Sequence, residues 1–97
     1  MEIKQSSIAG TMESSDIMIT VEPPDKDGIE IDLKSTVEKH YGRQIRAVIE
    51  ETLHKLGVDN AKIIAVDKGA MDCAVRARVC AAVCRATGQK KFDWGLL

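Results

Sequence analysis

The sequence predicts a two-layer α+β fold, a small mixed sheet of three or four strands with two helices on one face, in the order ββ(β)αβα. Three observations predict it. Apolar and polar residues alternate early in the chain, apolar residues recur at helical spacing in two later segments, and a short apolar run separates those segments. The 97 residues suffice for one hydrophobic core. We therefore expect one domain over residues 1–97, with residues 88–97 as an irregular C-terminal tail.

The first strands are expected on either side of polar turns. Residues 17–22 and residues 29–34 both alternate apolar with polar side chains, which is the period of a half-buried strand. Residues 23–28 between them are rich in proline, aspartate and glycine, so we expect a turn there and an antiparallel pair. Upstream, residues 8–12 are expected to form another short strand, with the polar residues 13–16 as a hairpin tip.

A long helix is expected next. Ser35 and Glu38 form a capping-box pattern, in which each side chain binds a free backbone N–H at the start of a helix. Charged residues occupy one face of the following segment, and its other face is expected to be buried. The positions of that face are Val37, Tyr41, Ile45, Val48, Ile49, Thr52 and Leu56. Gly57 supplies the left-handed residue that ends many helices.

A strand and a second helix complete the expected fold. Residues 61–66 are almost wholly apolar, so we expect a strand that is buried on both faces. Asp67 is placed to cap a helix over residues 70–86, which Gly88 ends. The expected buried stripe of this helix is Ala70, Cys73, Ala77, Cys80, Ala81 and Cys84. Strand, helix and strand in succession predict a parallel pair with a right-handed crossover.

Charge and composition disfavour several classes of function. The net charge is −1, with both signs spread along the chain, which argues against nucleic acid as a partner. Residues 1–10 lack the apolar region of a secretory signal peptide, and the branched apolar run of residues 63–66 is far too short to span a bilayer. Three cysteines, an odd number, are more typical of a reducing compartment than of a disulfide framework. We therefore expect a cytoplasmic protein without a membrane partner.

No set of side chains in the sequence marks a catalytic or metal site. Cys73, Cys80 and Cys84 fall on one helical face, but a straight helix splays them apart. We therefore expect these cysteines to pack in the core rather than to bind zinc. His40 and His54 are about 21 Å apart along the expected helix, too far to share a ligand.

The remaining polar candidates have ordinary structural explanations. Arg76, Arg78 and Arg85 do not all share one helical face, so we expect a solvated surface rather than a phosphate clamp. Trp94 either contacts a partner or folds back on the core, and the sequence leaves both possibilities open. Ser14 lies in a polar turn, where serine is common, so its residue type alone marks no site.

Three segments carry a resemblance to a known family. They are Ala9-Gly10-Thr11-Met12-Glu13-Ser14-Ser15-Asp16, Val66-Asp67-Lys68-Gly69-Ala70-Met71-Asp72-Cys73 followed by Arg76-Ala77-Arg78, and a looser match from Ser35 to Gly42. Their sequences and spacings, which extend over nearly the whole chain, resemble the citrate lyase acyl carrier protein, the gamma subunit of that complex. No single motif is decisive, but the combination is specific.

The resemblance implies a covalent prosthetic group, 2'-(5''-phosphoribosyl)-3'-dephospho-CoA, joined to a serine through a phosphodiester. Ser14 occupies the position of that serine, and Ser15 follows it where relatives often have glycine. Ser14 is therefore the expected attachment site and Ser15 the alternative. A hairpin tip suits attachment because a modifying enzyme can reach it.

The resemblance also implies a carrier that is not an enzyme by itself. The acetyl thioester on the arm would exchange with citrate, releasing acetate and forming a citryl thioester. Cleavage of the citryl thioester would yield oxaloacetate and restore the acetyl form. The implied partners are the alpha subunit (acyl transferase), the beta subunit (citryl lyase), a prosthetic-group transferase and an acetate ligase.

Two alternatives remain open at this point. The acyl carrier of malonate decarboxylase bears the same kind of arm, although the run of residues 67–73 favours citrate lyase. A non-covalent α+β interaction module would bind a partner through its sheet or tail, and it predicts no modified serine. Four-helix pantetheine carriers are disfavoured because the chain lacks their Asp-Ser-Leu run at a helix start.

Overall fold

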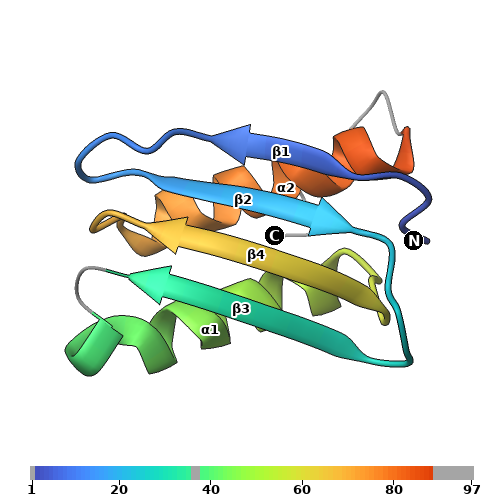
Figure 1. The fold of residues 1–97 in the computed structure, drawn as a ribbon, viewed down its shortest axis with the longest axis horizontal. Helices are drawn as coiled ribbons and strands as arrows, with labels where there is room; N and C mark the ends of the chain where they lie inside the picture. The colour runs from blue at the N-terminus through green and yellow to red at the C-terminus, as the bar shows by residue number, and fades with distance from the viewer. Residues whose placement is uncertain (1, 36–37, 89–97) are drawn as a thin grey trace.

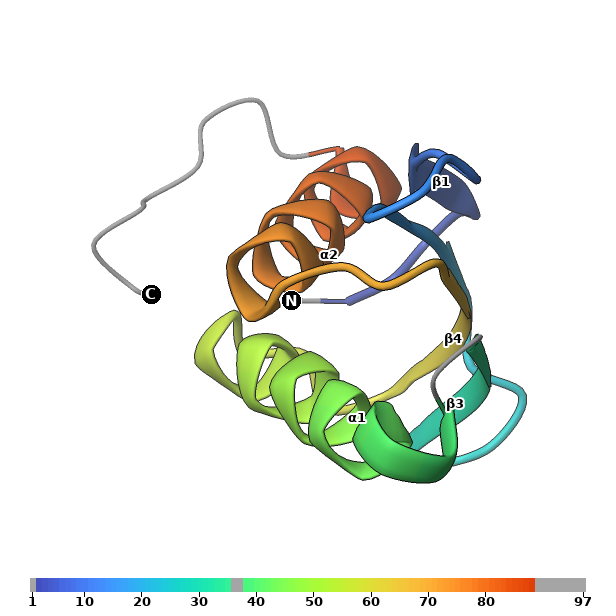
Figure 2. The same cartoon turned by 90° about the vertical axis from the view of Figure 1, so that its left-hand side faces the viewer.

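The chain folds as a four-stranded mixed sheet with both helices on one of its faces, as a computed structural model shows (Figures 1 and 2). The structure describes residues 2–35 and 38–88. Its elements are β1 (Ser7–Gly10), β2 (Ile17–Glu22), β3 (Ile29–Ser35), α1 (Glu38–Lys55), β4 (Ala61–Asp67) and α2 (Asp72–Thr87). The expected α+β class, its two layers and the order of its elements are confirmed. The expected tail lies outside the described residues beyond Gly88.

The order of the strands in the sheet differs in part from the expected one. The strands lie in the order β1-β2-β4-β3, with β1–β2 and β2–β4 antiparallel and β3–β4 parallel. The expected hairpin of the first two strands and the parallel pair across α1 are confirmed. The expected antiparallel pairing of residues 17–22 with residues 29–34 is wrong, because β4 lies between these two strands (Figure 1). The central position gives the apolar β4 a hydrogen-bonded neighbour on each side.

Alternating side chains of β2 and β4 build the sheet side of the core. The helix-facing residues are fully buried: Ile17, Ile19, Val21, Ala61, Ile63 and Ala65. The intervening side chains are only partly covered, because both helices lie on the same face of the sheet (Figure 2). The expectation that residues 61–66 are buried on both faces is therefore wrong, and Ile64 and Val66 remain partly exposed on the outer face.

Helix α1 buries the expected face. Its buried residues include Ile45, Val48, Ile49 and Thr52, together with Leu53, and the expected Leu56 is buried directly after the helix. Gly57, with φ of 75°, follows the helix in the left-handed conformation that was expected there. The expected capping box and the expected contacts of Val37 and Tyr41 depend on residues 36–41, which lie outside the side chains that the structure describes.

Helix α2 buries a different stripe from the expected one. Its buried residues are Val75, Val79, Cys80, Ala82, Val83 and Ala86. Of the expected stripe only Cys80 is buried, while Cys73 and Ala77 are exposed. The expectation was wrong because alanine, cysteine and valine surround this helix on most sides, so the apolar pattern does not select one face. The larger valines remove more apolar surface from water, and they therefore face the sheet.

Gly10, the last residue of β1, supplies a stability prediction. Gly10 and Gly28 both have φ of 101°, but a Cβ at Gly10 would lie 1.9 Å from Ile17 O, whereas a Cβ at Gly28 would meet no atom within 4 Å. Gly28→Ala should therefore cost only backbone strain, about 1 kcal/mol. Gly10→Ala adds a clash and should lower the free energy of unfolding by more than about 2 kcal/mol. Urea denaturation of both variants measures the difference, and equal losses would contradict the described approach of β1 to β2.

Candidate functional site

Ser14 lies in the loop of residues 11–16, which joins β1 to β2 at one end of the sheet (Figure 1). Residues 11–15 are all exposed, and Ser14 is among them. The expected hairpin tip is therefore confirmed, and it presents the serine to solvent. We call residues 11–16 the Ser14 loop.

The Asp16 carboxylate organises the Ser14 loop. Its Oδ2 accepts hydrogen bonds from Thr11 Oγ1 at 2.6 Å and from Arg78 Nη2 at 2.9 Å. Its Oδ1 accepts from Ile17 N at 2.7 Å and from Arg78 Nε at 3.2 Å, so the guanidinium binds the carboxylate through two nitrogens. These contacts lower the pKa of Asp16 to about 2, with the Thr11 hydrogen bond as the largest cause and the Arg78 hydrogen bonds as the second. The ionised carboxylate thus connects the two ends of the loop to α2.

Backbone hydrogen bonds hold the residues on both sides of Ser14. Glu13 N donates to Thr11 Oγ1 at 3.2 Å. Ser15 N donates to Lys68 O at 2.8 Å, and Lys68 N donates to Asp16 O at 2.9 Å, so the loop is joined to the connection between β4 and α2. Asp16 N donates a hydrogen bond to Glu13 O at 3.2 Å, which closes the turn of residues 13–16. Ser14 is therefore an exposed residue on a fixed backbone.

Asp67 fixes the connection to which the Ser14 loop is joined. This buried carboxylate accepts hydrogen bonds from Ser35 Oγ at 2.9 Å and from Ala70 N at 2.9 Å. The expectation that Asp67 caps the second helix is wrong, because α2 begins at Asp72 and its N-cap residue is Met71. Asp67 instead ties together the ends of β3 and β4 and the first part of the connection to α2.

Ser15 has a backbone conformation that glycine would adopt more easily. Its φ of 64° is the only positive φ among the described non-glycine residues. A side chain in this region is strained, whereas glycine is not. The conformation at Ser15 is therefore one that a glycine would adopt without strain.

Arg78 is the residue of this site that sequence reasoning missed. It was assigned to the solvated helix surface, and its side chain is 40% exposed, yet it binds Asp16 of the loop. Arg85 donates to Ile8 O at 2.6 Å, so it also contacts the hairpin. Both Asp16 and Arg78 lie in the segments that carry the family resemblance. This was the one feature of the sequence that could have indicated a shared role for the two residues.

The other candidate residues do not assemble into a site. Cys80 is buried, and its burial raises the pKa of its thiol to about 11, so core packing is confirmed for this residue. The expectation of core packing is wrong for Cys73, which is exposed. The described residues contain no group of three or more metal-ligating side chains. His54 lies on the surface of α1 and the side chain of His40 lies outside the description. No helix in the described ranges is long and apolar enough to cross a membrane.

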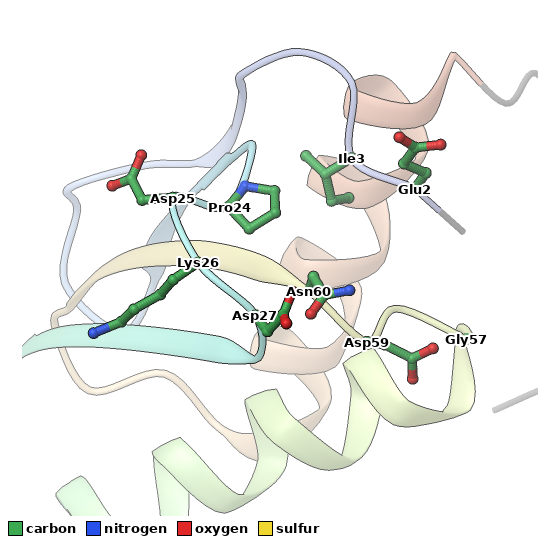
Figure 3. Close-up of a pocket in the computed structure, with 9 residues that line it drawn as sticks. All are labelled: Glu2, Ile3, Pro24, Asp25, Lys26, Asp27, Gly57, Asp59 and Asn60. Carbon is green, nitrogen blue, oxygen red and sulfur yellow. The ribbon is translucent and has the colours of Figure 1, made fainter.

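A pocket of about 420 Å³ is lined in part by residues 24–27 (Figure 3). These residues follow β2, whereas the Ser14 loop precedes it, so the pocket and the loop lie at opposite ends of that strand. Four of its lining side chains are carboxylates, those of Glu2, Asp25, Asp27 and Asp59. The single ammonium group among them, on Lys26, extends away from Glu2 and Asp59 in Figure 3. Carboxylates repel phosphate groups, so this pocket does not suit a phosphate-rich cofactor.

Comparison with known proteins identifies the family. Residues 4–86 match an ACP family described as malonate decarboxylase delta subunit. The chain is 56% identical to the citrate lyase acyl carrier protein of Streptococcus mutans, 58% to that of Streptococcus uberis and 56% to that of Lacticaseibacillus casei. Each match covers 97% of this chain and 92% of the relative. The chain belongs to the citrate lyase acyl carrier protein family. The expected family is confirmed, and its members are carrier proteins rather than enzymes.

Solved structures share the fold of this citrate lyase acyl carrier family member. A chain of the Pseudomonas malonate decarboxylase hetero-tetramer in complex with malonate matches with a TM-score of 0.70 at 18% identity, over 87% of this chain and 86% of that chain. Homoserine kinase from Cytophaga hutchinsonii matches with a TM-score of 0.64 at 15% identity, over 100% of this chain and 40% of that chain. These likenesses concern the fold alone, since one fold serves unrelated functions.

Asp16→Asn should reduce the dependence of stability on pH between about 4 and 2. The pKa of Asp16 in the folded chain is about 2, below the ordinary value of 3.8. The ionised form therefore stabilises the fold above about pH 4, and this contribution is lost as the pH falls towards 2. Urea denaturation at steps from pH 7 to pH 2 should show the variant less stable at neutral pH and equal to the wild type near pH 2. Thr11→Val, which removes the largest cause of the shift, should weaken the same dependence; parallel curves for all three proteins would contradict the network.

Proposed function

We propose that the chain is the acyl carrier subunit of citrate lyase and that Ser14 carries 2'-(5''-phosphoribosyl)-3'-dephospho-CoA. One observation supports the site above all others: Ser14 is exposed, while its two neighbours are held by backbone hydrogen bonds. A transferase can reach such a hydroxyl without unfolding the carrier. Ser15 is the weaker alternative. Its left-handed backbone is one that glycine adopts more easily, and an attachment residue must carry a hydroxyl, which glycine lacks.

Attachment of the group is a phosphoryl transfer to the Ser14 oxygen. That oxygen attacks the phosphorus of an activated polyphosphate ester of the group, a P–O bond to Ser14 forms, and the bond to the polyphosphate leaving group breaks. The hydroxyl proton passes to a base of the transferase. Asp16 is a poor candidate for that base, since its pKa of about 2 makes it a weak proton acceptor. The carrier therefore supplies the nucleophile, and the transferase supplies the catalysis.

The carrier contributes position rather than chemistry in this proposal. When attached, the group supplies a thiol that carries acyl groups as thioesters. A flexible tether on a fixed residue raises the effective concentration of its end at nearby active sites to the order of millimolar. The acidic pocket at the other end of the molecule disfavours binding of the group's phosphates, which leaves the tether free to reach partner subunits.

Partner enzymes are proposed to contact the end of the molecule that carries Ser14. These partners are the alpha and beta subunits of citrate lyase, the prosthetic-group transferase and an acetate ligase, in the cytoplasm. Met12, in the Ser14 loop, is 51% exposed, and Met71, in the connection that the loop binds, is 73% exposed. Methionine adapts its shape to different apolar surfaces, which suits a carrier domain that meets several enzymes in turn.

A carrier for malonate decarboxylase is the second candidate. Two observations favour it: the description of the family that residues 4–86 match, and the TM-score of 0.70 to a chain of the malonate decarboxylase hetero-tetramer. The modified chain should be combined separately with the partner subunits of each complex. Formation of oxaloacetate from citrate would support the citrate lyase assignment. If the chain instead supports only the release of carbon dioxide from malonate, the malonate decarboxylase assignment would take its place.

Co-expression with the prosthetic-group transferase should add the mass of one group to the wild-type chain. Ser14→Ala should remain unmodified, because it lacks the attacking oxygen. Ser15→Gly should be modified like the wild type, because glycine fits the φ of 64° and leaves Ser14 in place. Intact-mass measurement and fragmentation check the number of groups and the modified residue.

Protein made without the transferase supplies the unmodified reference mass. A group on Ser15, or on Ser6 or Ser7, would contradict the site but not the carrier function. A wild-type chain that stays unmodified beside an active transferase would contradict the proposal and favour a non-covalent interaction module.

A further inference from the structure

We propose that Asp16 and Arg78 form a positioning pair that sets the direction in which the Ser14 loop presents its serine to the transferase. The inference rests on the proposed attachment at Ser14, and it adds a function for a residue of α2 that does not touch the reacting atoms. The pair joins the loop to α2, and its two residues are 62 positions apart in the sequence.

The contacts of the Asp16 carboxylate enclose the attachment residue. Thr11 begins the loop and Asp16 ends it, and the hydrogen bond of 2.6 Å between their side chains closes the loop around Ser14. Arg78 binds the same carboxylate at 2.9 and 3.2 Å from the side of α2. The guanidinium therefore fixes the closed loop to α2, in addition to the backbone hydrogen bonds that join Ser15 and Asp16 to Lys68.

The exposure of this pair indicates orientation rather than stability as its main effect. The side chain of Arg78 is 40% exposed and that of Asp16 is 14% exposed. Solvent at the partly exposed guanidinium screens this ion pair, so we expect the Arg78 contact to add less to stability than the Thr11 hydrogen bond, which is the larger cause of the lowered Asp16 pKa. A guanidinium that binds through two nitrogens nevertheless fixes the direction of its partner, which a single ammonium does not.

The direction of the serine matters because the proposed transfer has a strict geometry. The Ser14 oxygen must approach the phosphorus opposite the leaving group, and displacement of a reacting atom by about 1 Å can slow an enzymatic step by about 100-fold. A loop that is already oriented needs less rearrangement in the complex with the transferase. The pair should consequently affect the rate of transfer at saturation more than the binding of the carrier.

Arg78→Gln should lower the kcat of group transfer to the wild-type Ser14 by about tenfold, with the KM for the carrier changed less than about twofold. Arg78→Lys should recover only part of the rate, because an ammonium cannot make the two-nitrogen contact. The assay uses the full chain, purified transferase and the activated donor, with mass spectrometry as the readout. If Arg78→Gln does not fold, Thr11→Val tests the same closed loop.

Two arginines of the same helix provide matched controls. Arg85→Gln removes the hydrogen bond of 2.6 Å to Ile8 O, so it weakens a contact between α2 and the same hairpin but leaves the Ser14 loop intact. Arg76→Gln removes a charge two residues from Arg78. Both should be modified at the wild-type rate, and a loss in Arg85→Gln equal to that in Arg78→Gln would mean that only general stability matters.

A double-mutant cycle provides the decisive comparison. If the two residues act as one pair, Asp16→Asn combined with Arg78→Gln should be no slower than the slower of the two single variants. Additive losses, or an unchanged kcat in Arg78→Gln while the wild type is modified, would overturn the positioning role and leave the attachment at Ser14 intact. Failure of the wild type to be modified would instead contradict the proposed function itself, and the inference with it.

Discussion

The central position of β4 is the constraint on which the rest of the structure depends. Its helix-facing residues, Ala61, Ile63 and Ala65, are fully buried, and its two neighbours β2 and β3 pair with it along almost their whole length. Burial of one such isoleucine contributes roughly 1.5–3 kcal/mol. The last residue of β4, Asp67, also begins the connection that receives the Ser14 loop, so the core and the proposed attachment site share one element.

The Ser14 loop cannot be ordered by apolar burial, because the proposed modification requires an exposed serine. Polar contacts order it instead, through the ionised Asp16 and the backbone bonds between Ser15 and Lys68. Hydrogen bonds to an ionised group are stronger than those between neutral groups, which makes them suited to an exposed loop. In the proposed function, this ordered loop would serve as a fixed attachment point for a flexible tether.

Local pattern predicted the elements well and their neighbours less well. Alternation in residues 17–22 and 29–34 identified two strands, but alternation shows only which side chains share a face, so the insertion of β4 between them was not visible. The face of α2 was missed because its alanines, cysteines and valines are all apolar. Ser14 was singled out by resemblance alone and stays a prediction. The Asp16–Arg78 contact joins residues far apart in the sequence, which no local pattern reveals.

The two outermost strands of the sheet each have a backbone carbonyl occupied by an arginine from the helix layer. Arg85 of α2 donates to Ile8 O of β1 at 2.6 Å, and Arg46 of α1 donates to Ile31 O of β3 at 2.8 Å. Strands at the rim of a sheet otherwise offer free acceptors to a strand of another molecule, and this is a route to aggregation. Each arginine occupies one acceptor on its rim, which disfavours the pairing of that strand with a strand of another molecule.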